Sequence, residues 1–281
     1  VEFANSDPAH PANQAWRPSP VRGVVLATAI QNGPINWQDG EGPFYPTIAI
    51  SQSSSGPGYD MVGGGFGNGN IDINTGRAGT HGSSPEGNFA FSAAWFPYDQ
   101  GWLGGEVGTP IVGDPNGVLP DGAARWTSPN AHSAGLTARM VSWTEFPTGF
   151  LTYGGLAKVK LPGVNSLEDG MLFAISSDGG SDVNILGVNP EADGNGWTVT
   201  IREDSAIDAE TLASGDQSEF QFVYIPFNAQ RLVGGHVVGS SGAKRMAAGD
   251  FTVARTGTGR YEVTLPGKTG SDGTLLLQVA D

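Results

Sequence analysis

Acidic side chains beside aromatic residues are the groups in this chain whose types and spacing could support catalysis. Asp99 lies between Trp95 and Trp102, and Glu145 follows closely after Trp143. Glycoside hydrolysis uses a pair of carboxylates, one in an apolar setting and the second roughly 5–9 Å away. A strand glutamate beside aromatic residues is more often a solvated side chain, so we expect no catalytic residue. A carbohydrate-active enzyme, a glycosidase or lyase, is the lesser alternative.

Motifs of nucleophilic and metal-assisted hydrolysis are missing from the sequence. It contains neither Gly-x-Ser-x-Gly nor His-Glu-x-x-His, and its four histidines are scattered. His236 stands out because its counterpart in the repeat described below is Glu106. A position that holds Glu in one copy and His in the other is expected to face solvent, with a pH-sensitive contact as the alternative.

Acidic turns are the candidates for a metal site. Asp178 and Asp182 flank a Gly-Gly-Ser turn, and Asp193 lies between Glu191 and Asn195. Calcium takes several oxygen ligands from flexible loops of this composition. The alternative is a set of Asx-rich turns that bind no ion, and no other cofactor is expected.

Composition indicates a globular chain with an apolar core. Of 281 residues, 38% are hydrophobic and 15% are charged, and 7 are Trp and 13 are Phe. The 44 Gly and 19 Pro, without a Gly-x-y period, are typical of many tight turns between short strands. Acidic residues outnumber basic ones by 28 to 14, which disfavours nucleic acid and anionic membrane surfaces as partners.

The same features predict a secreted protein, extracellular or on the cell surface. The sequence has no Cys and no apolar run of transmembrane length. It begins at Val1 rather than Met, as chains do after signal-peptide cleavage or after trimming. We therefore expect no membrane insertion and no disulfide, so that stability comes from burial.

Alternating apolar and polar residues predict β-strands through most of the chain. Val159–Leu161, Trp197–Ile201 and Tyr261–Leu265 show this pattern, and Pro-Gly and Asp-Gly pairs supply turns. Only residues 205–214 and 243–248 suit short helices. The predicted fold is all-β with almost no helix. Its expected core includes Phe91, Trp95, Leu172, Phe220, Tyr224 and Leu276.

Four blocks of sequence occur twice in the same order, which predicts an internal repeat. The matched blocks are Phe91–Tyr98 with Phe220–Phe227, Leu103–Val107 with Val233–Val237, Gly155–Gly163 with Gly259–Gly267, and Glu168–Phe173 with Ser271–Leu276. A third copy of the last block is Arg22–Ala27, so an apolar strand is expected at about 24–30, 171–176 and 274–280. We predict two divergent repeats of a jelly-roll or β-sandwich unit.

Three tryptophans lie outside this repeat and are candidate binding residues. Trp102 is replaced by Arg231 in the second copy, and Trp126 and Trp143 lie in or near an insertion. Aromatic residues without a repeated core role are the better candidates for stacking on a sugar ring or on a neighbouring subunit. Extracellular glycans are therefore an expected alternative partner.

The repeat divides the chain into an N-terminal arm, residues 1–22, and two β-units, residues 23–135 and 136–281. The first unit carries an insertion at 108–138. In another phase residues 136–227 form one sandwich, and the halves 23–107 and 228–281 are complementary parts of a second. These halves either close on each other within the chain or join between subunits.

The arm is a candidate assembly element. It holds four prolines, which favour an extended conformation, and carries the apolar residues Val1, Phe3 and Trp16. Arms with apolar anchors are used in exchange between subunits. The chain itself is therefore the main expected partner, as a homo-oligomer that forms a filament, with an ordinary terminal tail as the alternative.

The repeated blocks also carry a resemblance. The patterns at Phe220–Phe227, Gly259–Gly267 and Asp272–Leu277 resemble those of secreted bacterial proteins with tandem all-β repeats of poorly characterised function. More loosely, they are similar to the jelly-roll head domains of phage tail fibres and of C1q-like proteins. The resemblance implies a β-sandwich unit and association of subunits.

Taken with the lack of a catalytic motif, these features predict a non-catalytic extracellular structural or interaction protein. We expect a self-assembling subunit of a surface fibre, appendage or matrix. A carbohydrate-binding protein that uses Trp102, Trp126 and Trp143 is the alternative.

Overall fold

The computed structural model describes residues 23–30, 46–52, 71–77, 90–108, 126–127, 129–145, 153–176, 185–202, 219–258 and 260–280. These residues form strands β1 to β16, with a short 3-10 helix, Tyr98–Gln100, and a short helix α2, Pro129–Ser133. The predicted all-β class is confirmed. In these ranges the structure has no helix long and apolar enough to span a membrane.

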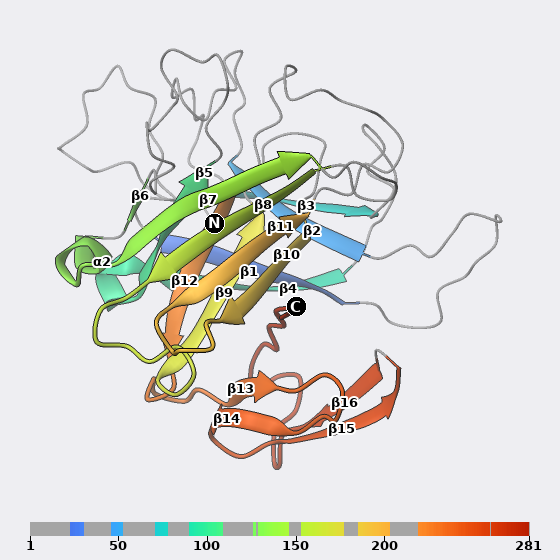
Figure 1. Ribbon diagram of the computed structural model, residues 1–281. Coiled ribbons are helices and arrows are strands. Elements are labelled where there is room, and N and C mark those ends of the chain that lie inside the picture. The colour runs from blue at the N-terminus through green and yellow to red at the C-terminus, as the bar shows by residue number, and fades with distance from the viewer. Residues whose placement is uncertain are drawn as a thin grey trace, which may run out of the picture.

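Two sheets pack face to face as a β-sandwich, with the smaller sheet in front in Figure 1. The smaller sheet has the order β10 (Ile185–Pro190), β11 (Trp197–Arg202), β8 (Tyr153–Lys160) and β7 (Thr137–Glu145). The larger sheet has the order β3 (Ile71–Arg77), β2 (Pro46–Gln52), β9 (Gly170–Ser176), β12 (Glu219–Pro226), β5 (Leu103–Gly108) and β6 (Trp126–Thr127).

The core between these sheets is built by the alternation that the sequence displays. Ala157 and Val159 of β8 and Val199 of β11 are fully buried, while the residues between them are less so. Trp197 and Phe222 are among the largest fully buried side chains and belong to the same cluster. Since strand side chains alternate between faces, one face of each sheet supplies the core.

Strand β12 is buried on both faces, because a third layer covers the larger sheet. Phe220 and Phe222 face the sandwich core, whereas Val223 belongs to a second cluster. That second cluster includes Val24 and Leu26 of β1 (Gly23–Ile30), which pairs with β4 (Ala90–Pro97). A continuous apolar run such as Phe222–Ile225 is the pattern expected of a strand covered on both sides.

The C-terminal part forms two hairpins below the sandwich (Figure 1). They are β13 (Gly234–Val237) with β14 (Lys244–Ala248), and β15 (Thr252–Gly257) with β16 (Arg260–Thr264). The prediction of a helix at 243–248 was wrong, since these residues are strand β14. Pairing with β13 after the left-handed Gly242 turn overrides their local helix propensity. Residues 205–214, the other predicted helix, lie outside the described residues.

Residues 274–280, predicted as a third apolar strand, follow an extended path with a single bridge, Gly187 to Val279. The Gln278 side chain ties the path to both sheets: its Nε2 donates to the Leu186 carbonyl at 3.0 Å and its Oε1 accepts from the Ala174 amide at 2.9 Å. The predicted strand is therefore replaced by an extended tail that closes the edge of the sandwich between β9 and β10.

The predicted core is confirmed in part. Leu172, Phe220 and Tyr224 are buried, whereas Trp95 and Leu276 are only partly buried. The expectation for Trp95 and Leu276 was too strong, because both lie at the rim of the second cluster rather than between the two sheets. The side chain of Phe91 lies outside the described residues.

Backbone pairing shows the repeat at the level of strand register. In the β1–β4 ladder Gly23 lies opposite Pro97, and in the β9–β12 ladder Gly170 lies opposite Pro226. Both glycines are required by close approach. A Cβ on Gly23 would lie 2.5 Å from the Phe96 carbonyl oxygen, and one on Gly170 would lie 2.6 Å from that of Ile225. The same residue types thus make the same ladder twice.

The turn after each Leu-Pro-Gly also repeats. The Val164 amide donates to the Leu161 carbonyl at 3.2 Å, and the Lys268 amide donates to the Leu265 carbonyl at 3.1 Å. In both turns the glycine, Gly163 or Gly267, has a left-handed φ, of 75° or 67°. A type II turn requires this conformation at its third residue.

Candidate functional site

The structure places the backbones of the three tryptophans predicted to bind ligands on different elements. Trp102 is half-buried and packs edge-on against Phe96, with ring centroids 5.1 Å apart. Trp126 lies on β6 of the larger sheet, opposite Glu106, and Trp143 lies on β7 of the smaller sheet, opposite Gly155. The structure describes the backbones of Trp126 and Trp143 but not their side chains, so the binding of glycans by these residues stays a prediction.

The predicted assembly and metal residues are mostly beyond the described ranges. Val1, Phe3 and Trp16 of the arm and Asp178 and Asp182 of the first acidic turn all lie outside them. Their roles stay predictions.

Asp193 of the second acidic turn is described. It is exposed, and its carboxylate accepts a hydrogen bond from the Asn195 amide at 2.9 Å. This is an Asx turn, the alternative to a calcium ligand. Within the described ranges no three His, Asp or Glu residues are grouped so as to hold a metal ion.

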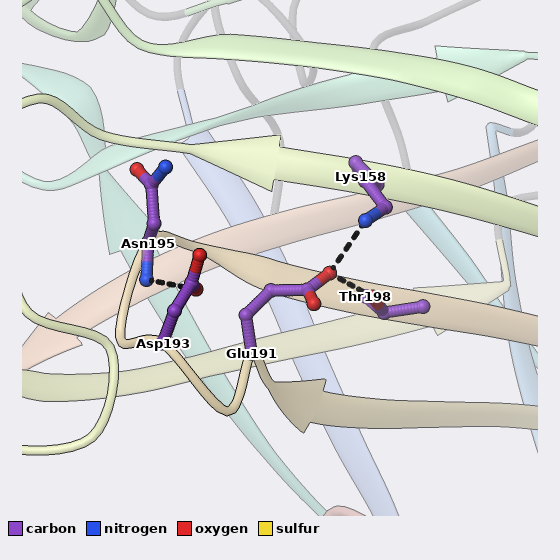
Figure 2. A network of polar contacts seen from close by, with 5 residues as sticks. All are labelled: Lys158, Glu191, Asp193, Asn195 and Thr198. Atoms are coloured by element: carbon purple, nitrogen blue, oxygen red, sulfur yellow. Dashed lines mark hydrogen bonds and ion pairs between the residues drawn. The ribbon is translucent and has the colours of Figure 1, made fainter.

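A polar network fixes the turn between β10 and β11 (Figure 2). Glu191 lies between Lys158 of β8 and Thr198 of β11. Its Oε1 is 3.0 Å from the Lys158 Nζ and accepts a hydrogen bond from the Thr198 hydroxyl. The Thr198 bond, followed by Lys158, lowers the pKa of Glu191 below its ordinary value of 4.5. The network joins three strands of one sheet and has the character of a structural clamp.

We expect Glu191→Gln to cost about 0.5 kcal/mol at neutral pH, the range of partly exposed ion pairs. A lowered pKa stabilises the fold above the ordinary value, and this contribution is lost as the pH falls through the folded pKa. The difference between variant and wild type should therefore vanish in acid. Urea denaturation at several pH values measures it. Asp193→Asn, which keeps the turn acceptor and leaves the Lys158 and Thr198 contacts of Glu191 in place, is the control and should cost less at neutral pH.

The C-terminal hairpins and tail expose residue positions that are buried in the first occurrence of the repeat. Tyr261 is 42% exposed where its counterpart, Ala157, is fully buried. Leu275 is 50% exposed, whereas its counterpart Leu172 is 3% exposed. The hairpins thus carry the sequence of half a sandwich. Among the described residues each is a two-stranded sheet, and the two hairpins contact each other where the Tyr261 hydroxyl donates to the Gly239 carbonyl.

Glycines in this part of the chain show the same difference. Gly104 of β5 has a strand beside it: a Cβ there would lie 2.4 Å from the Phe222 carbonyl oxygen. Its counterpart Gly234 would meet only side-chain carbons, of Met171 at 3.4 Å and of Leu232 at 4.0 Å. A Cβ on Gly273, the counterpart of Gly23 and Gly170, would meet no described atom within 4 Å. At Gly234 and Gly273, therefore, no described backbone atom lies close enough to require glycine.

His236 lies on β13 and is half-buried. The expectation that this position faces solvent stays a prediction. Burial, and next the nearby Arg245 charge, lower its pKa below the ordinary value of 6.5. The side chain is therefore neutral at neutral pH and adds no charge to the hairpin.

The exposure of individual hairpin residues was not predicted from the sequence, although the repeated blocks contained the information. The blocks at 233–237 and 259–267 match strands that are buried elsewhere. Comparison with protein-family models, with curated proteins and with solved structures gives no match. The candidate functional site is therefore defined by the chain's own repeat: the surface of β13 to β16 together with the tail, residues 274–280, which we call the open half.

Proposed function

We propose that the chain is a non-catalytic extracellular structural protein that self-assembles into a surface fibre, appendage or matrix. The observation that carries the proposal is the open half, where Tyr261 and Leu275 are exposed although their repeat counterparts are core residues. Large exposed apolar patches on soluble proteins are typical of interaction sites.

Sheet edges support the same proposal. Among the described residues β13–β14 and β15–β16 are each two-stranded sheets. An isolated two-stranded hairpin is marginally stable in water, and an unpaired edge is a template for another strand. A structural role accounts for both features, because assembly covers the apolar side chains and pairs the edges. The acidic net charge of −14 keeps such a subunit soluble before it assembles.

The proposal is tested by the mass of the full chain in solution. We expect light scattering to show a mass that rises with protein concentration in the micromolar range. Val263→Asp should reduce association by about tenfold or more, because it places a charge on the face that Val159 buries in the counterpart strand.

Glu262→Gln is the matched control. Glu262 is exposed and lies next to Val263 on the same strand, so its replacement should leave the mass unchanged. A wild-type chain that stays monomeric at all concentrations tested would refute the proposal. Binding to a panel of glycans by that monomer would then favour the carbohydrate-binding alternative.

A further inference from the structure

The strand order of the sandwich occurs a second time in the chain, divided into two pieces. In the larger sheet the consecutive strands are β9, β12, β5 and β6. The repeat counterparts of β9, β12 and β5 are β1, β4 and β13, in that order. β14 corresponds to β6 because it pairs with β13 as β6 pairs with β5. The four counterparts form two separate sheets, β1–β4 and β13–β14. Joined at β4 and β13, the two pieces would reproduce the four-strand order.

We infer that β13 of one copy of the chain pairs with β4 of a second copy, as β5 pairs with β12 within the chain. The inference rests on the proposed self-assembly and specifies its partner and its register. Among the described residues, each two-stranded piece ends at the strand that the other piece requires. The partner is therefore a second copy of this chain.

The pairing of β13 with β14 matches that of β5 with β6. Gly105 and Glu106 lie opposite Thr127 and Trp126, and Gly235 and His236 lie opposite Ala247 and Met246. On its other side β5 pairs with β12, while β13 is the edge of its sheet in the described part of the chain. The edge of β13 that faces away from β14 is thus the one that the second copy uses.

Gly234 provides independent support for this pairing. Its counterpart Gly104 has to be glycine because β12 approaches it closely, at the Phe222 carbonyl. No described residue makes the same demand at Gly234, where a Cβ would be in ordinary van der Waals contact. An incoming β4 strand supplies the missing reason for glycine at this position.

The register follows from the ladder within the chain. There Val223 lies opposite Gly104 and Gln221 lies opposite Glu106. The repeat places Ala94 at the position of Val223 and Ser92 at that of Gln221. In the assembled pair Ala94 therefore lies opposite Gly234, and Ser92 lies opposite His236.

The smaller sheet of the sandwich predicts a second ladder between the same two copies. Its order is β10, β11, β8 and β7. β16 is the repeat counterpart of β8 and pairs with β15, and the hairpin β2–β3 lies between β1 and β4 in chain order as β10–β11 lies between β9 and β12. In the described structure β2 joins the larger sheet through one residue pair, Ala49 with Ser176 of β9. β8 pairs with β11. Its counterpart β16 would pair with β3 of the second copy. Two ladders, one in each sheet, close a second sandwich over the apolar side chains of the open half.

Among the described residues β4 and β13 belong to different sheets of one chain, so their pairing is assigned to a second copy. Within the chain the open half is attached at both ends. Leu232, just before β13, packs against the second cluster, and Gln278 holds the tail. Because β4 and β13 are different surfaces, the contact is head-to-tail and propagates into a filament or a ring.

Cysteine cross-linking tests the register, because the natural chain has no Cys. Ser92→Cys and His236→Cys, prepared as separate proteins and mixed, should form a disulfide-linked dimer under mild oxidation. Opposed strand residues lie within disulfide reach. Ser92→Cys mixed with Ala247→Cys is the control. It should give no dimer, since Ala247 lies one strand further away, roughly 9–10 Å from Ser92.

Gly234→Ala tests the close approach. We expect about a tenfold or greater loss of association with an unchanged midpoint of urea denaturation, because the added methyl fits the free chain but not the ladder. Gly257→Ala, at another open position, should alter neither.

The outcomes separate this inference from the proposed function. If the chain associates but the Ser92–His236 cross-link does not form and Gly234→Ala has no effect, the β4–β13 pairing is wrong. The proposed self-assembly would remain supported in that case. A chain that carries both Ser92→Cys and His236→Cys can instead form the disulfide within itself. If that disulfide forms at the same rate on dilution, β4 pairs with β13 of the same chain and not with that of a second copy. A monomeric wild type would overturn both.

Discussion

Replacing Trp197 by alanine is expected to lower the free energy of unfolding by about 3–5 kcal/mol, the range measured when large aromatic side chains are removed from cores. Trp197 is 2% exposed and belongs to the cluster between the two sheets. Its ring lies 5.5 Å from that of Tyr224, so it joins β11 of one sheet to β12 of the other. Its loss leaves a cavity that neither sheet can close without moving.

Urea denaturation followed by circular dichroism measures this effect, since the fluorescence of the protein changes with the substitution. Trp102→Ala is the control. Trp102 is half-buried at the rim of the second cluster, so its loss should cost clearly less. Equal losses at the two positions would mean that Trp197 is not central to the sandwich.

Leu172→Ala is expected to cost about 2–5 kcal/mol, as for other buried leucines. Leu172 is 3% exposed on β9, opposite Tyr224 in the ladder with β12. Burial raises the pKa of Tyr224 to about 12, and its hydroxyl donates to the Asp169 carbonyl at 3.1 Å. The Leu172 side chain therefore packs where water is excluded, and its removal is not compensated by solvent.

The repeat provides a matched control for Leu172. Leu275 occupies the corresponding position in the tail and is 50% exposed. In the monomer Leu275→Ala should change stability by about 0.5 kcal/mol or less. The pair of variants is compared at a concentration at which wild type is monomeric. Similar costs for both would show that the tail position is as buried as the strand position.

Local pattern was sufficient to predict the all-β class, whereas the repeat of a jelly-roll unit stays a prediction. Alternation at Val159 and Val199 marks one-sided strands, and Gly-apolar blocks mark the start of β1 and β9. The ladder register follows the matched blocks, because the same close contacts recur at Gly23 and Gly170. These features depend on neighbouring residues and are therefore readable in a single sequence.

What could not be predicted depends on contacts distant in sequence. Residues 243–248 have helical composition, but a partner strand decides their structure. The larger sheet contains strands from both predicted units, since β5 of residues 23–135 pairs with β12 of residues 136–281. Local pattern alone does not tell which of two matching edges a strand will use.

The candidate site was harder to predict than the fold. Trp102 has no repeat counterpart, yet it packs against Phe96. The glycine at 234 looked like an ordinary turn or strand residue in the sequence. The role we infer for Gly234 follows only from the comparison with Gly104, where the Phe222 carbonyl lies too close for any residue with a Cβ.

The β5–β12 ladder also has a consequence for the kinetics of folding. Leu103 pairs with Tyr224, so most of the chain between them must be arranged before these strands can meet. Folding rates fall as contacts become more distant in sequence, and β proteins dominated by such pairings fold in milliseconds to seconds. We expect the closing of this ladder to limit the rate of folding. Until it closes, Phe220–Tyr224 remains an apolar strand with one side unpaired, and the chain is then most vulnerable to aggregation.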